Sequence, residues 1–250
     1  MSSVVEKGYY NQNDNEEVKL LEPLQSLPWE TSIPLASLLV KKLLSDNYAV
    51  YDGLMDPVEA DELKKEVQAY YSAGRMKDGE IGVGVDVAGK GSVRPEMRTD
   101  KVIWLEGNEP FVEKYMKRHI MRLDILTQKI SILLEAVAPE ESWAGAGRSK
   151  IMATVYPSNG SRYVAHYDNP DRNGRKLTAI FYLNDGWKPG DGGTLRMKTR
   201  GKSVDVAPLF NRLLVFWSDR RCPHEVLPAT GRDRYAITIW YMDRNEKVSK

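Results

Sequence analysis

The spacing of hydrophobic residues changes near residue 150 of the chain. Before that point apolar residues recur every three or four positions, as in amphipathic helices, in the segments 34–46, 57–72 and 109–138. Asp56-Pro57 has the composition of a helix start, and Pro139 follows the last of these segments. Short strands are predicted between the helices, at 48–51 and 101–105. The first part of the chain is therefore expected to be largely helical.

After residue 150 the pattern predicts a succession of short strands, separated by turns rich in glycine, asparagine and proline. These strands are 150–156, 162–167, 176–184, 193–199, 203–206, 212–217, 224–227 and 234–242. Many short strands in a row are typical of a β-sandwich or barrel. Helices followed by strands indicate an α+β protein, in which N-terminal helices buttress one sheet of a β-barrel.

A glycine-rich segment, 74–98, interrupts the helical part. It contains six glycines, mixed charge and little periodicity, so we expect a long flexible loop or hairpin. Long loops in compact domains are more often functional than idle. Residues 1–19 are expected to form a flexible polar tail and 244–250 a short charged tail, which leaves 20–243 as one domain.

Charge and cysteine content narrow the classes of function. Lysine and arginine number 36 and aspartate and glutamate 35, a net charge of +1, which argues against unspecific binding to nucleic acid or anionic membranes. The single cysteine, Cys222, excludes an internal disulfide and a multi-cysteine zinc module. No secretory signal or apolar run of membrane-spanning length is visible, so the expected location is the cytoplasm or nucleus.

Two of the three histidines lie in sequences that suit metal binding. His166 and Asp168 are two residues apart near the end of a predicted strand, so their side chains are expected on the same face. Together with His224 they would make the ligand set of two histidines and one carboxylate found in non-haem Fe(II) oxygenases, which leaves metal positions open for substrate and O₂. A His-X-Asp pair alone is weak evidence, and its ordinary interpretation is a surface hydrogen-bonding pair.

An arginine on the last strand adds to this pattern. Alternation along the strand puts Arg234, Ala236, Thr238 and Trp240 on one face. An arginine that faces the inside of a barrel is costly unless it meets an anion, and its planar fork suits a carboxylate. Considered alone, Arg234 would more often pair with a structural carboxylate of the same chain.

Several short motifs, in the same order, resemble the prolyl hydroxylases that modify hypoxia-inducible factor, a family of Fe(II)/2-oxoglutarate-dependent dioxygenases. The motifs are YPSNG at 156–160, HYDNP at 166–170, FYLN at 181–184, FWSDRR at 216–221, PHEV at 223–226 and RYAIT at 234–238. The dense resemblance covers about residues 150–243, with a fainter match around Arg98 and Trp104. It implies a double-stranded β-helix, a jelly-roll barrel of mostly antiparallel strands.

The resemblance also implies residue roles. The iron ligands would be His166, Asp168 and His224. Arg234 and Tyr182 would bind the distal carboxylate of 2-oxoglutarate, and the same pocket would be lined by Tyr156, Thr238, Met152 and Ile180. The protein substrate would meet Arg175, Trp240, Arg98 and Asp100, with segment 74–98 closing over it. The resemblance implies Fe(II) as the cofactor, with 2-oxoglutarate and O₂ as co-substrates. It is also compatible with ascorbate as a further cofactor.

Each role has an ordinary structural alternative. The tyrosines, Trp240, Met152 and Ile180 would be core residues in most proteins, and a loop arginine such as Arg175 is usually solvated. His119, on the longest predicted helix, is interpreted as structural or exposed.

Three details depart from the family pattern. Arg234 lies ten residues after His224, where nine is usual, and Gly231 is expected to absorb the additional residue in the turn. Arg232, on the same strand parity, is a competing candidate for the anion-binding arginine. Cys222 stands where the family carries asparagine, and is expected to be a small buried residue.

The activity implied is a protein prolyl 4-hydroxylase that uses O₂ and 2-oxoglutarate, acts on a proline in a hypoxia-inducible factor alpha segment and reports oxygen supply. Two alternatives stay open at this point. One is a 2-oxoglutarate oxygenase that acts on a ribosomal or translation-factor proline, or on a small molecule. The other is a catalytically silent barrel that serves as a binding module, although the complete ligand set argues against it.

Overall fold

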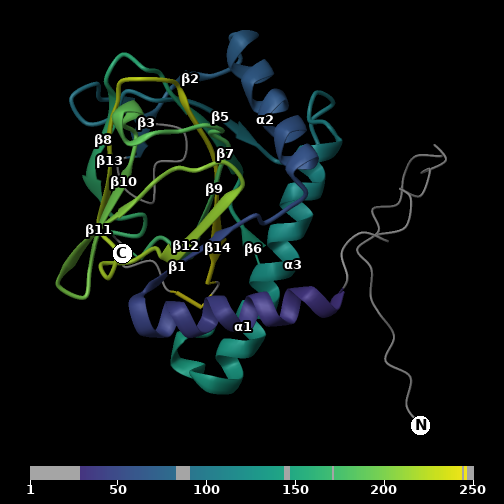
Figure 1. The fold of residues 1–250 in the computed structure, drawn as a ribbon. Coiled ribbons are helices and arrows are strands. Elements are labelled where there is room, and N and C mark those ends of the chain that lie inside the picture. The colour runs from purple at the N-terminus through teal and green to yellow at the C-terminus, as the bar shows by residue number, and fades with distance from the viewer. Residues whose placement is uncertain (1–28, 83–90, 144–146, 171, 244, 247–250) are drawn as a thin grey trace.

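Two β-sheets of mostly antiparallel strands form a double-stranded β-helix, with three helices on one side (Figure 1). The computed structural model describes residues 29–82, 91–143, 147–170, 172–243 and 245–246. The expected tail at 1–19 and most of the tail at 244–250 lie outside the described residues. The fold expected from the sequence, an α+β protein with a jelly-roll barrel, is therefore confirmed.

The larger sheet has eight strands. In order across the sheet they are β1 (Tyr48–Asp52), β12 (Arg212–Trp217), β9 (Arg175–Tyr182), β14 (Arg234–Met242), β7 (Ile151–Tyr156), β5 (Lys101–Leu105) and β2 (Lys77–Asp78), with β6 (Gly147–Arg148) paired to β14. The central strands β7, β9, β12 and β14 are mostly apolar and are buried on both faces at nearly every position. One face lines the barrel and the other receives the helices, which explains why these strands show no alternation of polar residues.

The smaller sheet has four strands and closes the opposite wall of the barrel. Its order is β11 (Lys202–Val206), β10 (Leu195–Thr199), β13 (His224–Ala229) and β8 (Ser161–His166). The pairing of β13 with β8 shifts register twice, between His224 and Val226 and again before Ala229. These irregularities re-aim side chains at the end of the two strands that carry the histidines.

The helices α1 (Trp29–Asp46), α2 (Pro57–Ser72) and α3 (Lys114–Val137) cover the larger sheet on one side (Figure 1). Helix α2 starts as expected, because the Asp56 carboxylate accepts hydrogen bonds from the backbone N–H groups of Val58 and Glu59. Helix α3 contacts the sheet directly, since the ring of His119 lies 4.6 Å from that of Phe181 on β9.

Two helix boundaries differ from the sequence expectation. Helix α1 begins before Pro34, although proline favours the first turn of a helix. Helix α3 begins at Lys114 rather than at 109, because the Glu109 carboxylate accepts hydrogen bonds from the N–H groups of Glu106 and Gly107 and so holds these residues in a turn.

The glycine-rich segment, expected as a flexible loop or a hairpin, forms a small hairpin of β3 (Glu80–Gly82) and β4 (Gly91–Val93). Its residues 83–90 lie outside the described part. The single-turn helices η1 (Pro139–Glu141) and η2 (Pro189–Asp191) complete the elements of the described residues. Among those residues no helix combines the length and apolarity that crossing a membrane requires.

Candidate metal centre

Three side chains expected to bind metal lie together at one end of the barrel. His166 ends β8, Asp168 follows it by two residues, and His224 begins β13 directly opposite His166. Their ligand atoms all lie within 4.8 Å of one another. Asp168 Oδ1 is 3.7 Å from His166 Nε2 and 3.9 Å from His224 Nε2.

Backbone carbonyl groups orient both imidazole rings. His166 Nδ1 lies 2.8 Å from the carbonyl oxygen of Val164, and His224 Nδ1 lies 2.9 Å from that of Cys222. Because a carbonyl oxygen only accepts, each Nδ1 carries the hydrogen and each Nε2 keeps a free lone pair. Histidine ligands of metals are commonly held in this way.

The Asp168 carboxylate is fixed by two hydroxyl groups. Thr178 Oγ1, on β9, donates to Asp168 Oδ2 at 2.6 Å, and it lies 2.8 Å from Ser218 Oγ. Oδ2 is thereby occupied, while Oδ1 faces the two histidines. The larger sheet thus orients a ligand that lies beside the smaller sheet.

The ionisation of the cluster suits a cation. Burial, reinforced by the neighbouring His224, lowers the pKa of His166 to about 3. Burial alone would raise the pKa of Asp168, but the two histidines and Arg175 hold it below its usual range. A neutral imidazole and an ionised carboxylate are the forms that bind a divalent metal. The donor set therefore fits an octahedral ion with open positions.

A cavity of about 620 Å³ lies next to the three ligands. Strands of both sheets line it, among them β7, β9 and β14 from the larger and β8, β10 and β13 from the smaller. Of the residues expected around 2-oxoglutarate, its walls include Arg234, Tyr156, Thr238, Met152 and Ile180.

Arg234 provides positive charge deep in this cavity. Arg234 is 3% exposed, and its Nε donates a hydrogen bond to the carbonyl oxygen of Gly193 at 2.7 Å. A side chain at Gly193 would lie within 2.8 Å of Arg234 Cδ, so only glycine leaves room for the arginine here. No carboxylate within the described segments forms an ion pair with Arg234, so the ordinary alternative of a structural partner does not apply.

Two tyrosines flank the guanidinium group. Its central carbon lies 4.8 Å from the ring centre of Tyr156 and 5.0 Å from that of Tyr182. The Tyr182 hydroxyl is fully buried beside Arg234 and forms no hydrogen bond of regular geometry with any of the described residues. Burial raises the pKa of Tyr182, against the effect of the nearby Arg234 charge, so its hydroxyl stays a donor. An uncharged donor beside a free guanidinium fits a carboxylate ligand.

Two of the residues expected to meet the protein substrate, Arg175 and Trp240, lie together on the cavity wall. The Arg175 guanidinium lies 4.2 Å above the ring of Trp240, which in turn stacks on Trp104 at 5.8 Å. Trp104 is 44% exposed, so this aromatic surface reaches solvent.

Arg98 and Asp100 have different positions. Arg98 lines the cavity and donates from Nε to Asp100 Oδ1 at 2.7 Å and from Nη1 to the carbonyl oxygen of Glu80 at 3.2 Å. Asp100 itself is 0% exposed and is not among the residues that line the cavity. The Asp100 carboxylate binds and orients Arg98. The sequence had instead suggested that Asp100 contacts the substrate.

Three other residues considered in the sequence, Arg232, Cys222 and His119, do not line the cavity. Arg232 is exposed, pairs with Asp191 at 3.1 Å and precedes the strand, so of these two arginines it is Arg234 that lines the cavity. Cys222 is buried as expected, and burial raises the pKa of its thiol to about 12, which makes it unreactive. His119 is fully buried, so the exposed alternative is wrong.

Several residues of the site are not predicted by the sequence motifs. Thr154 and Thr178 lie two positions from Met152 and from Ile180, on the same strand faces, so strand parity is the signal that indicates them. Tyr163 stacks on His166 at 3.7 Å between ring centres. Parity places these two residues on opposite faces, and only the irregular register of β8 and β13 brings their rings together.

Comparisons with known proteins agree with this geometry. Residues 151–242 match the family described as the 2OG-Fe(II) oxygenase superfamily. Egl nine homolog 1 of Homo sapiens is 38% identical over 203 residues, 80% of this chain and 44% of that protein. Prolyl hydroxylase EGLN3 of Homo sapiens is 36% identical over 214 residues, 80% of each chain.

A solved structure is also similar. It is a prolyl hydroxylase in complex with a hypoxia inducible factor oxygen degradation domain peptide fragment from Trichoplax adhaerens. The TM-score is 0.76 at 32% identity, and the match covers 87% of this chain and 93% of the other. The chain spans about half the length of the Egl nine homologs it matches.

Proposed function

This chain belongs to the prolyl hydroxylase family of the 2OG-Fe(II) oxygenase superfamily, and from that premise we propose that it is a protein prolyl 4-hydroxylase. Its cofactor would be Fe(II), with 2-oxoglutarate and O₂ as co-substrates. Its substrate would be a proline in a hypoxia-inducible factor alpha segment, so that its activity reports oxygen supply. The observation that carries the proposal is a complete His-Asp-His ligand set and an unpaired buried arginine on the walls of one cavity.

The chain's own residues would bind and orient the reactants. His166 and His224 would offer Nε2, and Asp168 would offer the oxygen that Thr178 leaves free. When bound, Fe(II) with 2-oxoglutarate and O₂ supplies the oxidising power to hydroxylate an unactivated C–H bond.

The buried end of the cavity would select 2-oxoglutarate. The Arg234 fork and the Tyr182 hydroxyl would bind a carboxylate at the end remote from the metal. Apolar side chains of Met152, Ile180 and Leu195 would exclude water around the chain of the ligand.

The open end of the cavity would bind a polypeptide. Arg175, Trp240 and Trp104 form an aromatic and cationic surface next to the metal ligands. A proline ring packs well against tryptophan, and an extended peptide carries backbone carbonyl groups that arginine can bind. The peptide held by the Trichoplax relative is the basis for choosing a hypoxia-inducible factor segment. For location we propose the cytoplasm or nucleus, because the one cysteine is a free buried thiol, as suits a reducing compartment.

The test is succinate formation by the purified chain with Fe(II), 2-oxoglutarate and a peptide from a hypoxia-inducible factor degradation segment. We expect peptide-stimulated turnover and a mass gain of one oxygen atom on the proline. The same peptide with alanine in place of proline serves as a control and should gain no oxygen. His166→Ala should lose both signals.

Other outcomes are equally informative. Turnover of 2-oxoglutarate without peptide oxidation would retain an oxygenase but reject the proposed substrate. Absence of any turnover, with the metal bound, would reject the enzyme and favour a silent binding module.

A further inference from the structure

We propose that Glu246 is a positioning residue that holds the loop between Asp168 and Arg175 in the shape needed to bind the protein substrate. The inference rests on the proposed function, because Arg175 is taken to face the peptide. Glu246 lies beyond the end of β14, in a part of the sequence that carries no catalytic motif.

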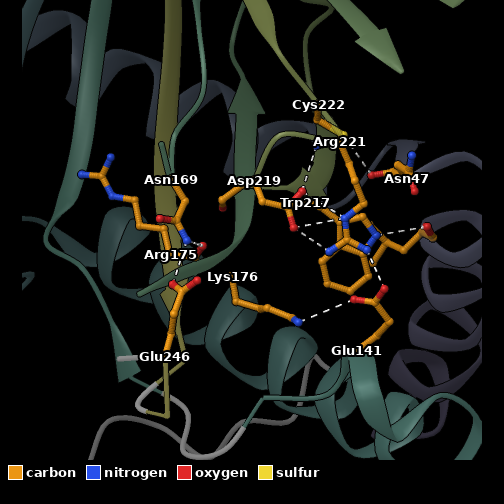
Figure 2. Close-up of polar contacts among 12 residues, drawn as sticks. Asn47, Glu141, Asn169, Arg175, Lys176, Trp217, Asp219, Arg221, Cys222 and Glu246 are labelled. Atoms are coloured by element: carbon orange, nitrogen blue, oxygen red, sulfur yellow. Dashed lines mark hydrogen bonds and ion pairs between the residues drawn. The ribbon is translucent and has the colours of Figure 1, made fainter. Parts of the chain in front are cut away.

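One carboxylate oxygen of Glu246 joins the two ends of this loop. Glu246 Oε2 accepts a hydrogen bond from Asn169 Nδ2 at 2.8 Å and another from the backbone N–H of Gly174 at 2.8 Å. Figure 2 shows Glu246 reaching from the C-terminal segment to Asn169, with the side chain of Arg175 directed away from it. The contact therefore acts on the loop and not on the guanidinium group.

Asn169 connects Glu246 to two further backbone groups of the loop. Its Nδ2 also donates to the carbonyl oxygen of Arg175 at 2.9 Å, and its Oδ1 accepts from the N–H of Asn173 at 2.7 Å. The residue is 7% exposed, so each polar atom of its amide is used inside the protein. Removing the Glu246 carboxylate would leave one buried N–H of Asn169 without an acceptor.

The loop needs support because its backbone is unusual. Arg172 has a φ of 57° and Gly174 a φ of 87°, both in the left-handed region, which a non-glycine residue occupies at a cost. Gly174 is held on both sides, since its carbonyl oxygen accepts from the N–H of Asp243 at 2.7 Å while its N–H donates to Glu246. Asp243 and Glu246 thus hold Gly174 by its carbonyl oxygen and its N–H group.

The two ends of the loop serve different ligands. Arg175 lies above Trp240 and donates from Nη1 to the carbonyl oxygen of Asp168 at 3.2 Å. The Asp168 carboxylate is fixed independently by Thr178. Loss of Glu246 should therefore release Arg175 more than Asp168, and should weaken binding of the peptide more than binding of metal or 2-oxoglutarate.

The experiment compares Glu246→Ala, Glu246→Gln and Asn245→Ala. In Glu246→Ala we expect the KM for the peptide to rise about 3- to 10-fold, as for the loss of one or two hydrogen bonds, while kcat and the KM for 2-oxoglutarate stay within about twofold. Glu246→Gln should behave like the wild type, because a single amide oxygen can accept both hydrogen bonds. Asn245 is exposed and its side chain forms no hydrogen bond or ion pair with the described residues, so Asn245→Ala is the matched control.

A second readout needs no activity. In the metal-free protein, amide hydrogen exchange at Gly174 and Asn173 should speed up in Glu246→Ala and stay unchanged in the Gln and Asn245→Ala variants. An unchanged peptide KM in Glu246→Ala, or an equal rise in Glu246→Gln, would overturn the inference. If the wild type oxidises no peptide, the proposed function fails, whatever the result for Glu246. The hydrogen-exchange measurement remains an independent test, because unchanged exchange at Gly174 in Glu246→Ala would show that Glu246 does not stabilise the loop.

Discussion

Arg234 gives the cavity its charge, and its surroundings determine what that charge can bind. The guanidinium group is buried between two tyrosine rings and makes no ion pair with any carboxylate of the described residues. A buried charge without a partner is costly, and a ligand carboxylate removes that cost. The neighbouring Arg232 has the same side chain but is exposed and paired with Asp191, so it offers a matched comparison.

Arg234→Lys should raise the KM for 2-oxoglutarate about 10- to 100-fold, because lysine keeps the charge but loses the planar fork. The measurement is the dependence of succinate formation on 2-oxoglutarate concentration. Arg232→Ala should leave this KM within about twofold of the wild type. Equal effects of the two substitutions would show that Arg234 does not bind the co-substrate.

His119 is a buried histidine that the candidate site does not use. Both of its ring nitrogens lack hydrogen-bond partners among the described residues, and burial, with a smaller effect of Arg122, lowers its pKa to about 3. Below pH 6.5 the unfolded chain binds a proton at this position, whereas the folded chain does not until about pH 3. Protonation of the unfolded chain therefore lowers the free energy of unfolding as the pH falls through this range.

His119→Phe should remove this part of the pH dependence. Between pH 7 and pH 5 the free energy of unfolding of the wild type should fall by about 2 kcal/mol more than that of the variant. Urea unfolding of the metal-free proteins at both pH values measures the difference. Parallel losses in the two proteins would mean that His119 is protonated in the folded state as well.

Among the elements, α3 supports the larger sheet from behind at β9 and β14. Its buried face includes Leu123, Leu126 and Ile130, and Asp124 accepts a hydrogen bond at 2.9 Å from the hydroxyl of Tyr241 on β14. Helix α3 thereby fixes the strand that carries Arg234 at its other end. Ile132, two residues from Ile130, lies on the outer face and is 60% exposed.

The same substitution at these two isoleucines should have very different effects. Ile130→Ala should lower the free energy of unfolding by about 2–5 kcal/mol, because it removes a fully buried side chain and leaves a cavity. Ile132→Ala should change it by less than about 0.5 kcal/mol. Urea unfolding of both variants tests this, and comparable losses would contradict the described orientation of α3.

For the whole molecule, the candidate metal centre lies where the two sheets meet. The histidines belong to the smaller sheet, while Thr178 of the larger sheet fixes Asp168. A metal bound here would tie the two walls of the barrel together in the folded state only. Binding should therefore stabilise the fold as a whole.

Fe(II) added without oxygen, at about 100 times its dissociation constant, should stabilise the protein by about 2.7 kcal/mol, or raise the Tm by about 5–10 °C. A chelator should reverse the shift. His166→Ala should abolish it, whereas His119→Phe should keep it. A shift that survives in His166→Ala would place the ion elsewhere.

Local patterns predicted much of this molecule. The strands at 101–105, 212–217 and 234–242 have the expected bounds, and the alternation of β14 correctly placed Arg234, Ala236, Thr238 and Trp240 on the cavity. The candidate ligands were also visible, since His166 and Asp168 are close in sequence and His224 lies in a similar motif. These features depend on spacing along one strand or on residue type, and both can be read from the sequence without knowledge of the fold.

Contacts that depend on pairing between distant strands were not predicted by these local patterns. The irregular register of β8 and β13 put Tyr163 against His166, and the fold closed Asp100 off from the cavity while leaving Arg98 on it. It also brought Glu246 to Asn169, 77 residues away. The hydrophobic period and the residue types predicted most helices and strands and the chemistry they carry, because both are local features. Which side chains meet was settled only by the register and packing of the two sheets, since a contact between distant residues has no local signature.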